Sequence, residues 1–137
     1  MKVVVHVDGG SRGNPGPAAA ASVVSSLDGE VLDESSRLLG VVSNNVAEYQ
    51  ALLLGLERAG ALGADAVEVI NDSELIAKQV NGAYKVKHAA MRPLHAESLS
   101  ALRAFQEWRV RTVPRAQNAH ADALVNAALD AAPAGAG

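Results

Sequence analysis

The chain contains no cysteine and very few aromatic residues. Without cysteine it can form neither a disulfide framework nor a thiolate metal site, and its four scattered histidines do not suggest a zinc site. Aromatic residues make up 3% of the chain, so it offers few platforms on which unpaired bases could stack. A cysteine-free chain suits a reducing compartment, and we expect a cytoplasmic protein.

Long hydrophobic runs are also missing. No apolar run approaches the ~18 residues of a membrane-spanning helix, and Met1-Lys2-Val3 leads directly into a strand pattern rather than a signal peptide. We therefore expect no association with a membrane. With 137 residues and 49% hydrophobic content, the chain is long enough for one domain with a core mainly of Val, Leu and Ala.

Charge is distributed unevenly along the chain. The net charge of −3 at pH 7 argues against broad, nonspecific binding to nucleic acid. Residues 78–115, however, contain eight basic and two acidic residues, which is a local excess of +6. This window predicts a basic face that could engage phosphates, although solvated Lys and Arg on surface helices would give the same pattern.

The order of hydrophobic patterns predicts one α/β domain. The predicted strands cover residues 3–7, 18–26, 31–39, 66–71 and 108–113, and the predicted helices cover residues 46–62, 72–80, 91–107 and 119–131. Three antiparallel strands followed by strands linked through helices imply a five-stranded mixed sheet flanked by helices. Residues 1–131 form the predicted domain, and residues 132–137 are expected to be a flexible Ala/Gly/Pro tail or a truncated linker.

The first predicted strand ends in a carboxylate that is followed at once by a glycine-rich loop. Val3 to Val7 is rich in β-branched residues and predicts a strand buried on both faces, with Asp8 at its C-terminal end. The loop continues from Gly9 to Pro17. An aspartate that opens a turn is the ordinary explanation, so the role of Asp8 depends on what else the fold brings to the same point.

Three further acidic residues occupy positions that fit a common site. At about 100° per residue, Glu48 points to the apolar side of its predicted helix, although a capping box with Asn45 would also explain it. Asp72 follows the fourth strand, and Asp122 lies in the first turn of the last helix. Helix capping and a favourable place near a helix N-terminus are their ordinary explanations. If the fourth strand runs parallel to the first, the fold order brings all four acids to one edge of the sheet.

Four gathered carboxylates imply a divalent cation. They repel one another and would shift towards protonation unless a cation neutralises them. Carboxylate oxygens favour Mg²⁺ or Mn²⁺, and two such ions can activate a water and stabilise the leaving oxygen of a phosphodiester. The pattern therefore predicts metal-dependent phosphoryl hydrolysis, with Asp8, Glu48, Asp72 and Asp122 as metal ligands.

Four segments resemble type 1 ribonuclease H, in the same order and within residues 1–131. They are DGGSRGNPGP at 8–17, SNNVAEY at 43–49, NDS at 71–73 and RAQNAHADAL at 115–124. The resemblance implies the ribonuclease H-like fold and the same four acids as metal ligands. It also implies an endonuclease that hydrolyses the RNA strand of RNA/DNA hybrids with two Mg²⁺ or Mn²⁺ ions, leaving 5′-phosphate and 3′-hydroxyl ends. A noncatalytic hybrid-binding module, or another nuclease of the superfamily, is the alternative.

The resemblance also implies which residues contact the hybrid. The glycine-rich loop would read the 2′-hydroxyls of the RNA strand, the asparagine pair after it would lie at the groove between strands, and Ser43 would contact a DNA phosphate. Helix capping is the ordinary alternative for the Ser-Asn-Asn segment. Double-stranded RNA stays open as a second substrate. The implied substrate-binding residues are Gly9, Gly10, Arg12, Asn14, Ser43, Asn44, Asn45 and Asn118.

Two departures from the well-known bacterial form place the chain near the archaeal and actinobacterial subgroup. The long, lysine-rich protrusion is reduced here to the segment at 85–88, and the loop before the last acid carries Arg115 in place of a mobile histidine. A guanidinium can stabilise phosphate charge but cannot shuttle protons at neutral pH. His120 is the rival for the assisting role, and His6 is expected to be structural. Actinobacterial relatives can join this domain to a phosphatase-like domain, so a C-terminal fusion is a further expectation.

Overall fold

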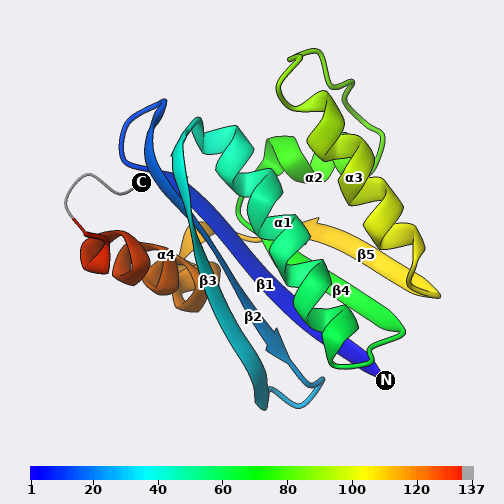
Figure 1. Cartoon of the computed structure of the whole chain (residues 1–137). Coiled ribbons are helices and arrows are strands. Elements are labelled where there is room, and N and C mark those ends of the chain that lie inside the picture. The colour runs from blue at the N-terminus through cyan, green and yellow to red at the C-terminus, as the bar shows by residue number, and fades with distance from the viewer. Residues whose placement is uncertain (134–137) are drawn as a thin grey trace.

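The computed structural model describes residues 1–133 and shows a five-stranded sheet with helices on both faces (Figure 1). The predicted fold class is confirmed, whereas residues 134–137 of the predicted tail lie outside the described residues. No helix within 1–133 is both long and apolar enough to cross a membrane. The elements in chain order are β1 (Lys2–Ser11), β2 (Gly16–Ser25), β3 (Val31–Val42), α1 (Asn44–Ala61), β4 (Ala66–Asn71), α2 (Glu74–Val80), α3 (Arg92–Arg103), β5 (Glu107–Thr112), the 3₁₀ turn η1 (Arg115–Asn118) and α4 (Ala119–Ala131).

The order of strands in the sheet places β1 at its centre. The order is β3-β2-β1-β4-β5, and β1 pairs antiparallel with β2 and parallel with β4. In the parallel pair, Lys2 lies opposite Ala66 and His6 lies opposite Ile70. Continuing this register brings residue 72 level with residue 8. Asp8 and Asp72 therefore lie at the same edge of the sheet, as their positions after two parallel strands predicted.

The main core lies between the sheet and α1. Val3, Val5 and Val7 project from β1 into this layer, and each is at most 3% exposed. At Gly55 of α1, an added Cβ would come within 2.6 Å of a Val7 methyl carbon. The helix can therefore lie this close to the centre of the sheet only because residue 55 has no side chain.

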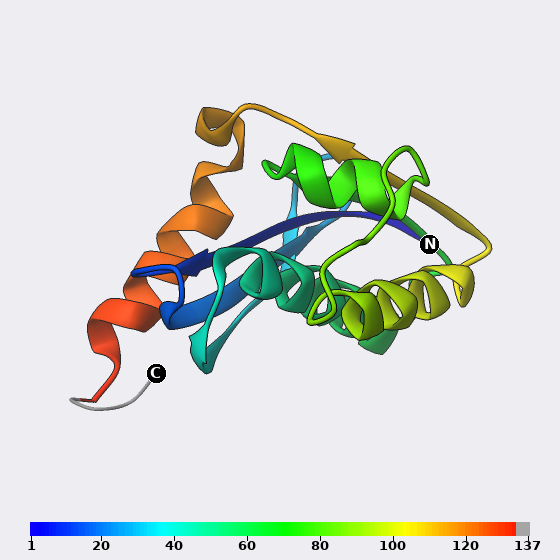
Figure 2. The same ribbon diagram turned by 90° about the horizontal axis from the view of Figure 1, so that it is seen from above.

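Within residues 1–133, α4 is the α-helix that covers the opposite face of the sheet. Val125 and Leu129 of α4 pack on Ala19 and Ala21 of β2. Figure 2 shows α4 across the sheet from α1 and α3. Because α4 covers β2 rather than the whole of β1, His6 is only half-buried. The prediction that the first strand is buried on both faces is wrong for this face.

Several predicted boundaries are corrected by the structure: β3 runs to Val42 rather than to residue 39, α2 begins at Glu74 rather than at residue 72, and two other boundaries differ more. The helix predicted over 91–107 ends at Arg103, since Glu107 already pairs with Ala66 as the first residue of β5. The first strand does not end at residue 7 but continues to Ser11, which lies opposite Ala18 of β2. The glycine-rich loop thus begins inside a paired strand, which gives its first residues fixed positions.

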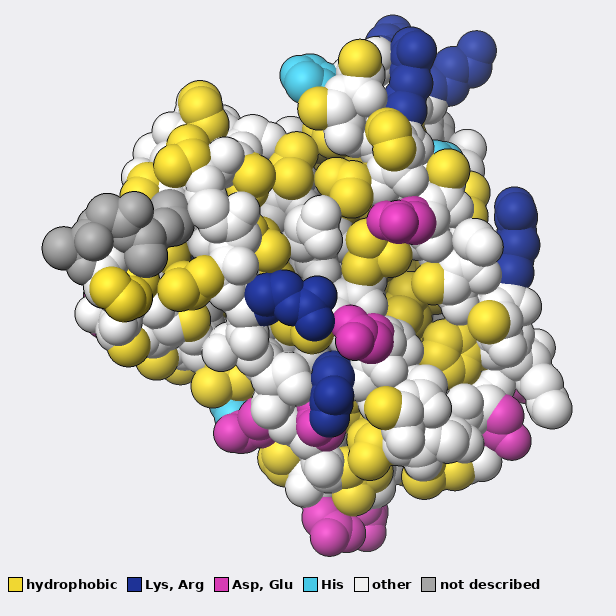
Figure 3. Space-filling model, viewed as in Figure 1, with side chains coloured by type: hydrophobic (Ala, Val, Ile, Leu, Met, Phe, Trp, Pro, Cys, Tyr) yellow, Lys and Arg dark blue, Asp and Glu magenta, His cyan; other side chains and the backbone are white. Residues whose placement is uncertain are grey.

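The basic window at 78–115 does not form one face. Arg111 of β5 pairs with Glu68 of β4, with a nitrogen–oxygen distance of 2.5 Å, on the sheet face opposite α3. Lys85, Lys87 and Arg92 are exposed around the connection between α2 and α3, where Figure 3 shows basic side chains gathered. The predicted basic face is therefore confined to this connection.

Substituting the close-packed glycine of α1 tests the packing of the core. Gly55→Ala is expected to lower the free energy of unfolding by about 1–3 kcal/mol, because the new methyl group overlaps Val5 and Val7. Gly60→Ala on the same helix is the matched control, since a Cβ there meets nothing within 4 Å. It should raise stability by up to about 1 kcal/mol through helix propensity. Urea denaturation measures both, and equal stability of the two variants would contradict the packing.

Candidate metal centre

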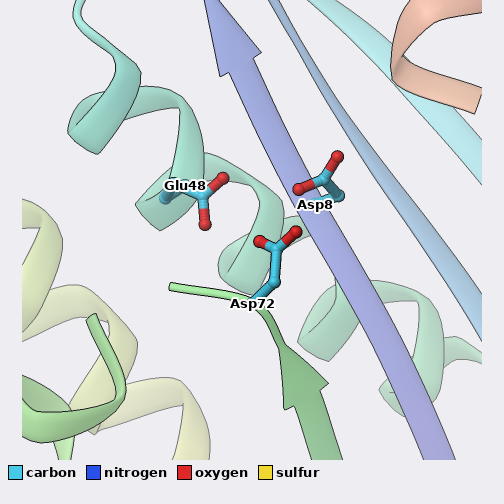
Figure 4. A group of neighbouring side chains, drawn as sticks. All are labelled: Asp8, Glu48 and Asp72. Atoms are coloured by element: carbon cyan, nitrogen blue, oxygen red, sulfur yellow. The ribbon is translucent and has the colours of Figure 1, made fainter. Parts of the chain in front are cut away.

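Three carboxylates from three elements converge at the edge of the sheet. Asp8 of β1, Glu48 of α1 and Asp72, just after β4, point towards one another (Figure 4). One carboxylate oxygen of each lies within 4.8 Å of those of the other two. Asp8 and Glu48 are 4% and 6% exposed. The arrangement is a cluster of hard oxygen donors of the kind that binds divalent cations.

Glu48 is held in the cluster by the backbone of β1. The N–H of Gly9 donates to Oε1 of Glu48 at 3.1 Å. A Cβ on residue 9 would lie 2.1 Å from the carbonyl oxygen of Ala47, so only glycine allows β1 to approach α1 so closely. The capping-box alternative with Asn45 is wrong, because the cap of α1 is the hydroxyl of Ser43.

Asp72 is positioned by its two neighbours in the chain. The side chain of Asn71 is buried, accepts a hydrogen bond from the N–H of Ser73 at 2.8 Å, and donates to the Arg111 carbonyl at 3.2 Å. These two bonds fix the turn between β4 and α2. The hydroxyl of Ser73 caps α2, so the explanation of Asp72 as the helix cap is wrong.

One oxygen of Asp72 lacks a hydrogen-bond partner. Oδ2 is buried and accepts no hydrogen bond from any residue in the described part of the chain. The guanidinium of Arg115 lies 3.8 Å away and is 82% exposed. A buried carboxylate oxygen without a donor is costly unless another positive group contacts it. This oxygen therefore fits a metal ligand better than a structural acceptor.

The fourth predicted acid, Asp122, lies beside Asp8 but outside the three-residue group. It is half-buried in the first turn of α4, where it lines a cavity with Asp8 and helps to raise the pKa of Asp8. The start of this helix is tied to β1 by Asn118, whose Nδ2 donates to the Val7 carbonyl at 2.8 Å. This bond therefore holds together the chain segments that carry Asp8 and Asp122.

Asn118 has a role that the sequence did not predict. Its side chain makes no capping hydrogen bond to α4, so the predicted cap is wrong. The residue is 1% exposed, which does not support the predicted contact with substrate. The structure shows instead a buried amide that joins α4 to the central strand, and no sequence signal distinguished this role from capping.

Burial and mutual repulsion raise the pKa values of two carboxyls. Burial raises the pKa of Asp8 to about 9, with further contributions from the charges of Glu48 and Asp72 and from Asp122. Burial also raises the pKa of Glu48 to about 8, with help from Asp72, while the Gly9 N–H and Arg115 act in the opposite direction. A divalent cation would reverse these shifts because it stabilises the ionised carboxylates.

The glycine-rich loop is fastened to the beginning of α1. Oδ1 of Asn14 accepts a hydrogen bond from the N–H of Asn44 at 3.1 Å, and Oδ1 of Asn44 accepts one from the N–H of Ser11 at 3.3 Å. Asn44 is exposed. It borders a cavity of about 380 Å³ that is lined by Gly9, Asn44, Glu48, Asp72, Ser73 and Arg115.

The other residues predicted to bind substrate lie close to this cavity or serve the fold. Gly10 and Arg12 line a second cavity that also contains Asp8 and Asp122. The Arg12 guanidinium is occupied by Asp130 of α4 at 2.6 Å. Asn45 is half-buried in the first turn of α1, where Ser43 is the cap. Their contacts with a substrate remain predictions.

The two rivals for an assisting role are separated by the structure. Arg115 lines both cavities beside the acids. His120 lies next to Glu34 of β3, with a nitrogen–oxygen distance of 2.5 Å. His6 lies on the same open face of the sheet, where burial, then the positive charges of Arg111 and His120, lower its pKa. Of the two residues, Arg115 is therefore the one that lies beside the acids.

Comparison with known proteins identifies the family. The family model described as "Reverse transcriptase-like" matches residues 6–128. Ribonuclease HI of Halobacterium salinarum is 43% identical over 129 residues, which are 94% of this chain and 65% of that protein. A bifunctional protein of Mycobacterium tuberculosis is 46% identical over 133 residues. That match covers 96% of this chain but 36% of the relative, so the chain spans about a third of the first curated relatives.

Solved structures agree with the fold and the subgroup. The crystal structure of ribonuclease H1 from Halobacterium salinarum has a TM-score of 0.94 and 42% identity, and the match covers 96% of this chain and 100% of that one. The structure of LC11 ribonuclease H1 in complex with an RNA/DNA hybrid has a TM-score of 0.89 and 40% identity, covering 93% and 96%. The archaeal and mycobacterial relatives match the predicted subgroup. The chain belongs to the reverse transcriptase-like family and, within it, to the type 1 ribonucleases H.

Proposed function

We propose that this chain is an endonuclease that hydrolyses the RNA strand of RNA/DNA hybrids and leaves 5′-phosphate and 3′-hydroxyl ends. The observation that carries the proposal is the convergence of Asp8, Glu48 and Asp72, whose oxygens lie within 4.8 Å of one another. The relative whose structure contains an RNA/DNA hybrid supports the choice of substrate. Double-stranded RNA is a second substrate to be tested.

The donor set fits a divalent metal. Every candidate ligand is a carboxylate, one Asp72 oxygen is buried without a partner, and the pKa values of Asp8 and Glu48 are raised. We propose that Asp8, Glu48, Asp72 and Asp122 hold two Mg²⁺ or Mn²⁺ ions. When bound, two such ions supply an activated water and stabilise the leaving oxygen of the phosphodiester.

The chain's own residues contribute positioning and charge. The Gly9 N–H orients Glu48, and the Asn71 side chain fixes the turn that presents Asp72. These contacts arise from paired strands and a packed helix, so the acids are held in place before substrate binds. Arg115, at the rim of the cavity, would neutralise part of the phosphate charge.

The loop and the start of α1 provide the hydrogen-bonding groups for the hybrid. The side chain of Asn14 accepts a hydrogen bond from the N–H of Asn44, which lines the cavity, and amide groups can both donate to and accept from a 2′-hydroxyl. We propose that Gly9, Gly10 and Arg12 flank the RNA strand, that Asn45 lies with Asn44 at the groove between the strands, and that Ser43 contacts a DNA phosphate. The exposed residues Lys85 and Lys87 would add nonspecific attraction for phosphates.

A phosphatase-like second domain and a cytoplasmic location stay proposals. The Mycobacterium tuberculosis relative is named a bifunctional protein, and this chain matches 36% of its length. That name supports a fusion in the relative and motivates the same expectation here. The lack of cysteine motivates the expected location.

Replacing the central carboxylate tests the catalytic proposal. Asp8→Asn is expected to lower the rate of hybrid cleavage at least about 100-fold, because a ligand and its charge are lost while the side chain keeps its shape. Asp28→Asn, in the exposed turn before β3, is the matched control and should cleave at the wild-type rate. The assay uses labelled hybrid, double-stranded RNA and double-stranded DNA, with and without Mg²⁺ or Mn²⁺.

Two outcomes of this assay would contradict the proposal. Cleavage by Asp8→Asn at the wild-type rate would exclude Asp8 from the mechanism. Wild-type protein that binds hybrid but shows no metal-dependent turnover would instead favour the noncatalytic binding module.

The raised pKa values predict a pH-dependent affinity for metal. The carboxyls of Asp8 and Glu48 bind protons up to about pH 9 and about pH 8, so a metal ion must displace protons at neutral pH. Affinity for Mn²⁺ should therefore rise from pH 6 to pH 9, by up to about tenfold per pH unit for each proton released. Calorimetry in buffers of different ionisation enthalpy measures the released protons. A constant affinity over this range would show that the carboxyls are already ionised.

Charge at residue 115 is expected to assist turnover. Arg115→Ala should lower kcat/KM about fivefold, since loss of a largely exposed charge near the phosphate costs roughly 1 kcal/mol. Arg115→Lys should retain most of the activity if charge alone matters. His120→Ala serves as the comparison and should leave the rate within twofold, because that side chain contacts Glu34 instead. A larger loss in His120→Ala than in Arg115→Ala would reverse the assignment.

A further inference from the structure

The edge strand β3 exposes an unusual share of the apolar side chains. It is the outermost strand of the sheet, so no strand of the described chain pairs with its outer edge (Figure 1). Eight large hydrophobic residues are exposed within residues 1–133, and five of them lie on β3 or in the turn before it. An exposed apolar edge is a template for pairing with another strand. The five residues are Leu27, Val31, Leu32, Leu38 and Val41.

The middle of β3 lacks some of the features that prevent edge pairing, although it carries the charged residues Asp33, Glu34 and Arg37. Its twelve residues include neither proline nor lysine. The pairing with β2 is irregular at Leu32 and Leu39, but residues 33–38 between them pair with β2 one for one. Six residues of regular, open edge are therefore available for another strand.

We propose that β3 pairs with β3 of a second copy of this chain, antiparallel across a two-fold axis at Ser35. Two identical antiparallel strands in one sheet are related by a two-fold axis normal to the sheet, so opposed side chains lie on the same face. Because side chains alternate between the faces along a strand, two opposed residues must be an even number of positions apart in the sequence. With the axis at Ser35, Glu34 lies opposite Ser36 and Asp33 lies opposite Arg37. Each of these pairs occurs twice, and the Asp–Arg pairs are of opposite charge.

Neighbouring registers are less favourable. An axis at Glu34 sets that carboxylate against its own copy, and an axis at Arg37 sets the two guanidinium groups together. An axis at Ser36 places Glu34 opposite Leu38. Like charges directly opposite one another destabilise an antiparallel pair, whereas opposite charges stabilise it. The charge pattern thus selects the register centred on Ser35.

The ion pairs between β3 and α1 would extend across such an interface. Arg37 contacts Glu57 at 3.2 Å, and Arg58 contacts Asp33 at 2.9 Å. In the proposed register, Arg37 of one copy lies next to Asp33 of the other. This contact joins the Arg37–Glu57 pair of one copy to the Asp33–Arg58 pair of the other, so basic and acidic groups alternate along a row. The two-fold axis produces a second such row. Figure 3 shows acidic and basic side chains interleaved between β3 and α1. Leu38 of one copy lies opposite Leu32 of the other, so these exposed apolar side chains cover each other.

A pair of opposite substitutions at Ser36 tests this interface. Ser36 is exposed and would face Glu34 of the other copy. Ser36→Glu should raise the dimer dissociation constant at least about tenfold, and Ser36→Lys should lower it several-fold, because two pairs change in each case. Ser100→Glu on the exposed surface of α3 is the control and should leave it unchanged. Sedimentation equilibrium measures the constants. Wild-type protein that stays monomeric up to about millimolar concentration, or equal constants for the two Ser36 variants, would overturn the proposal.

A single cysteine tests the register itself, since the chain has none of its own. Residue 35 meets its own copy on the axis, where opposed Cα atoms of an antiparallel pair lie about 4.5–5.5 Å apart. That separation allows a disulfide. Ser35→Cys should therefore form a covalent dimer under mild oxidation much faster than Ser100→Cys. Equal cross-linking rates would overturn the register, and the result does not depend on nuclease activity.

Discussion

The contact between β1 and α1 at Gly9 is the constraint on which the candidate site depends. A Cβ at this position would lie 2.1 Å from the Ala47 carbonyl oxygen, so a side chain of any kind would push the helix from the strand. Without a side chain, the Gly9 N–H comes within 3.1 Å of Glu48 and holds it beside Asp8. The first glycine of the loop therefore sets the distance between two of the acids before any substrate is present.

That closeness has an energetic cost. The pKa values of Asp8 and Glu48 are raised chiefly by burial and then by neighbouring carboxylates, so ionising both in the folded protein is unfavourable. The surrounding fold tolerates this cost because the acids are attached to elements that are stable for other reasons. Asp8 follows the buried valines of the central strand, and Asn118 ties the start of α4 to that strand through the Val7 carbonyl. Asn71 ties the end of β4 to β5 through the Arg111 carbonyl. Electrostatic strain is thus concentrated where a cation can relieve it.

Features that depend on periodicity and on the order of elements could be predicted from the sequence. Alternating and helical patterns located the strands and helices, and the order of elements placed Asp8 and Asp72 at one edge. Side chains with several possible partners were harder to interpret, because Ser, Asn and Asp can all cap a helix. Asn45 and Asp72 fitted capping rules, but Ser43 and Ser73 do the capping. The role of Asn118 could not be predicted, because its acceptor, the carbonyl of Val7, lies 111 positions away in sequence.

The two edges of the sheet show how sequence controls association as well as fold. β5 has only six residues, and its alternate positions carry the charged residues Glu107, Arg109 and Arg111. Short length and charge therefore protect this edge of the sheet against pairing with another strand. β3 has twelve residues, and its charges at 33, 34 and 37 are arranged so that one antiparallel register pairs opposite signs. Charged residues at an edge prevent pairing only if every register places like charges opposite one another or places a charge opposite an apolar side chain. On β3 one register places opposite charges next to each other. The charged residues of β3 therefore select this register for pairing with a second copy and do not prevent the pairing.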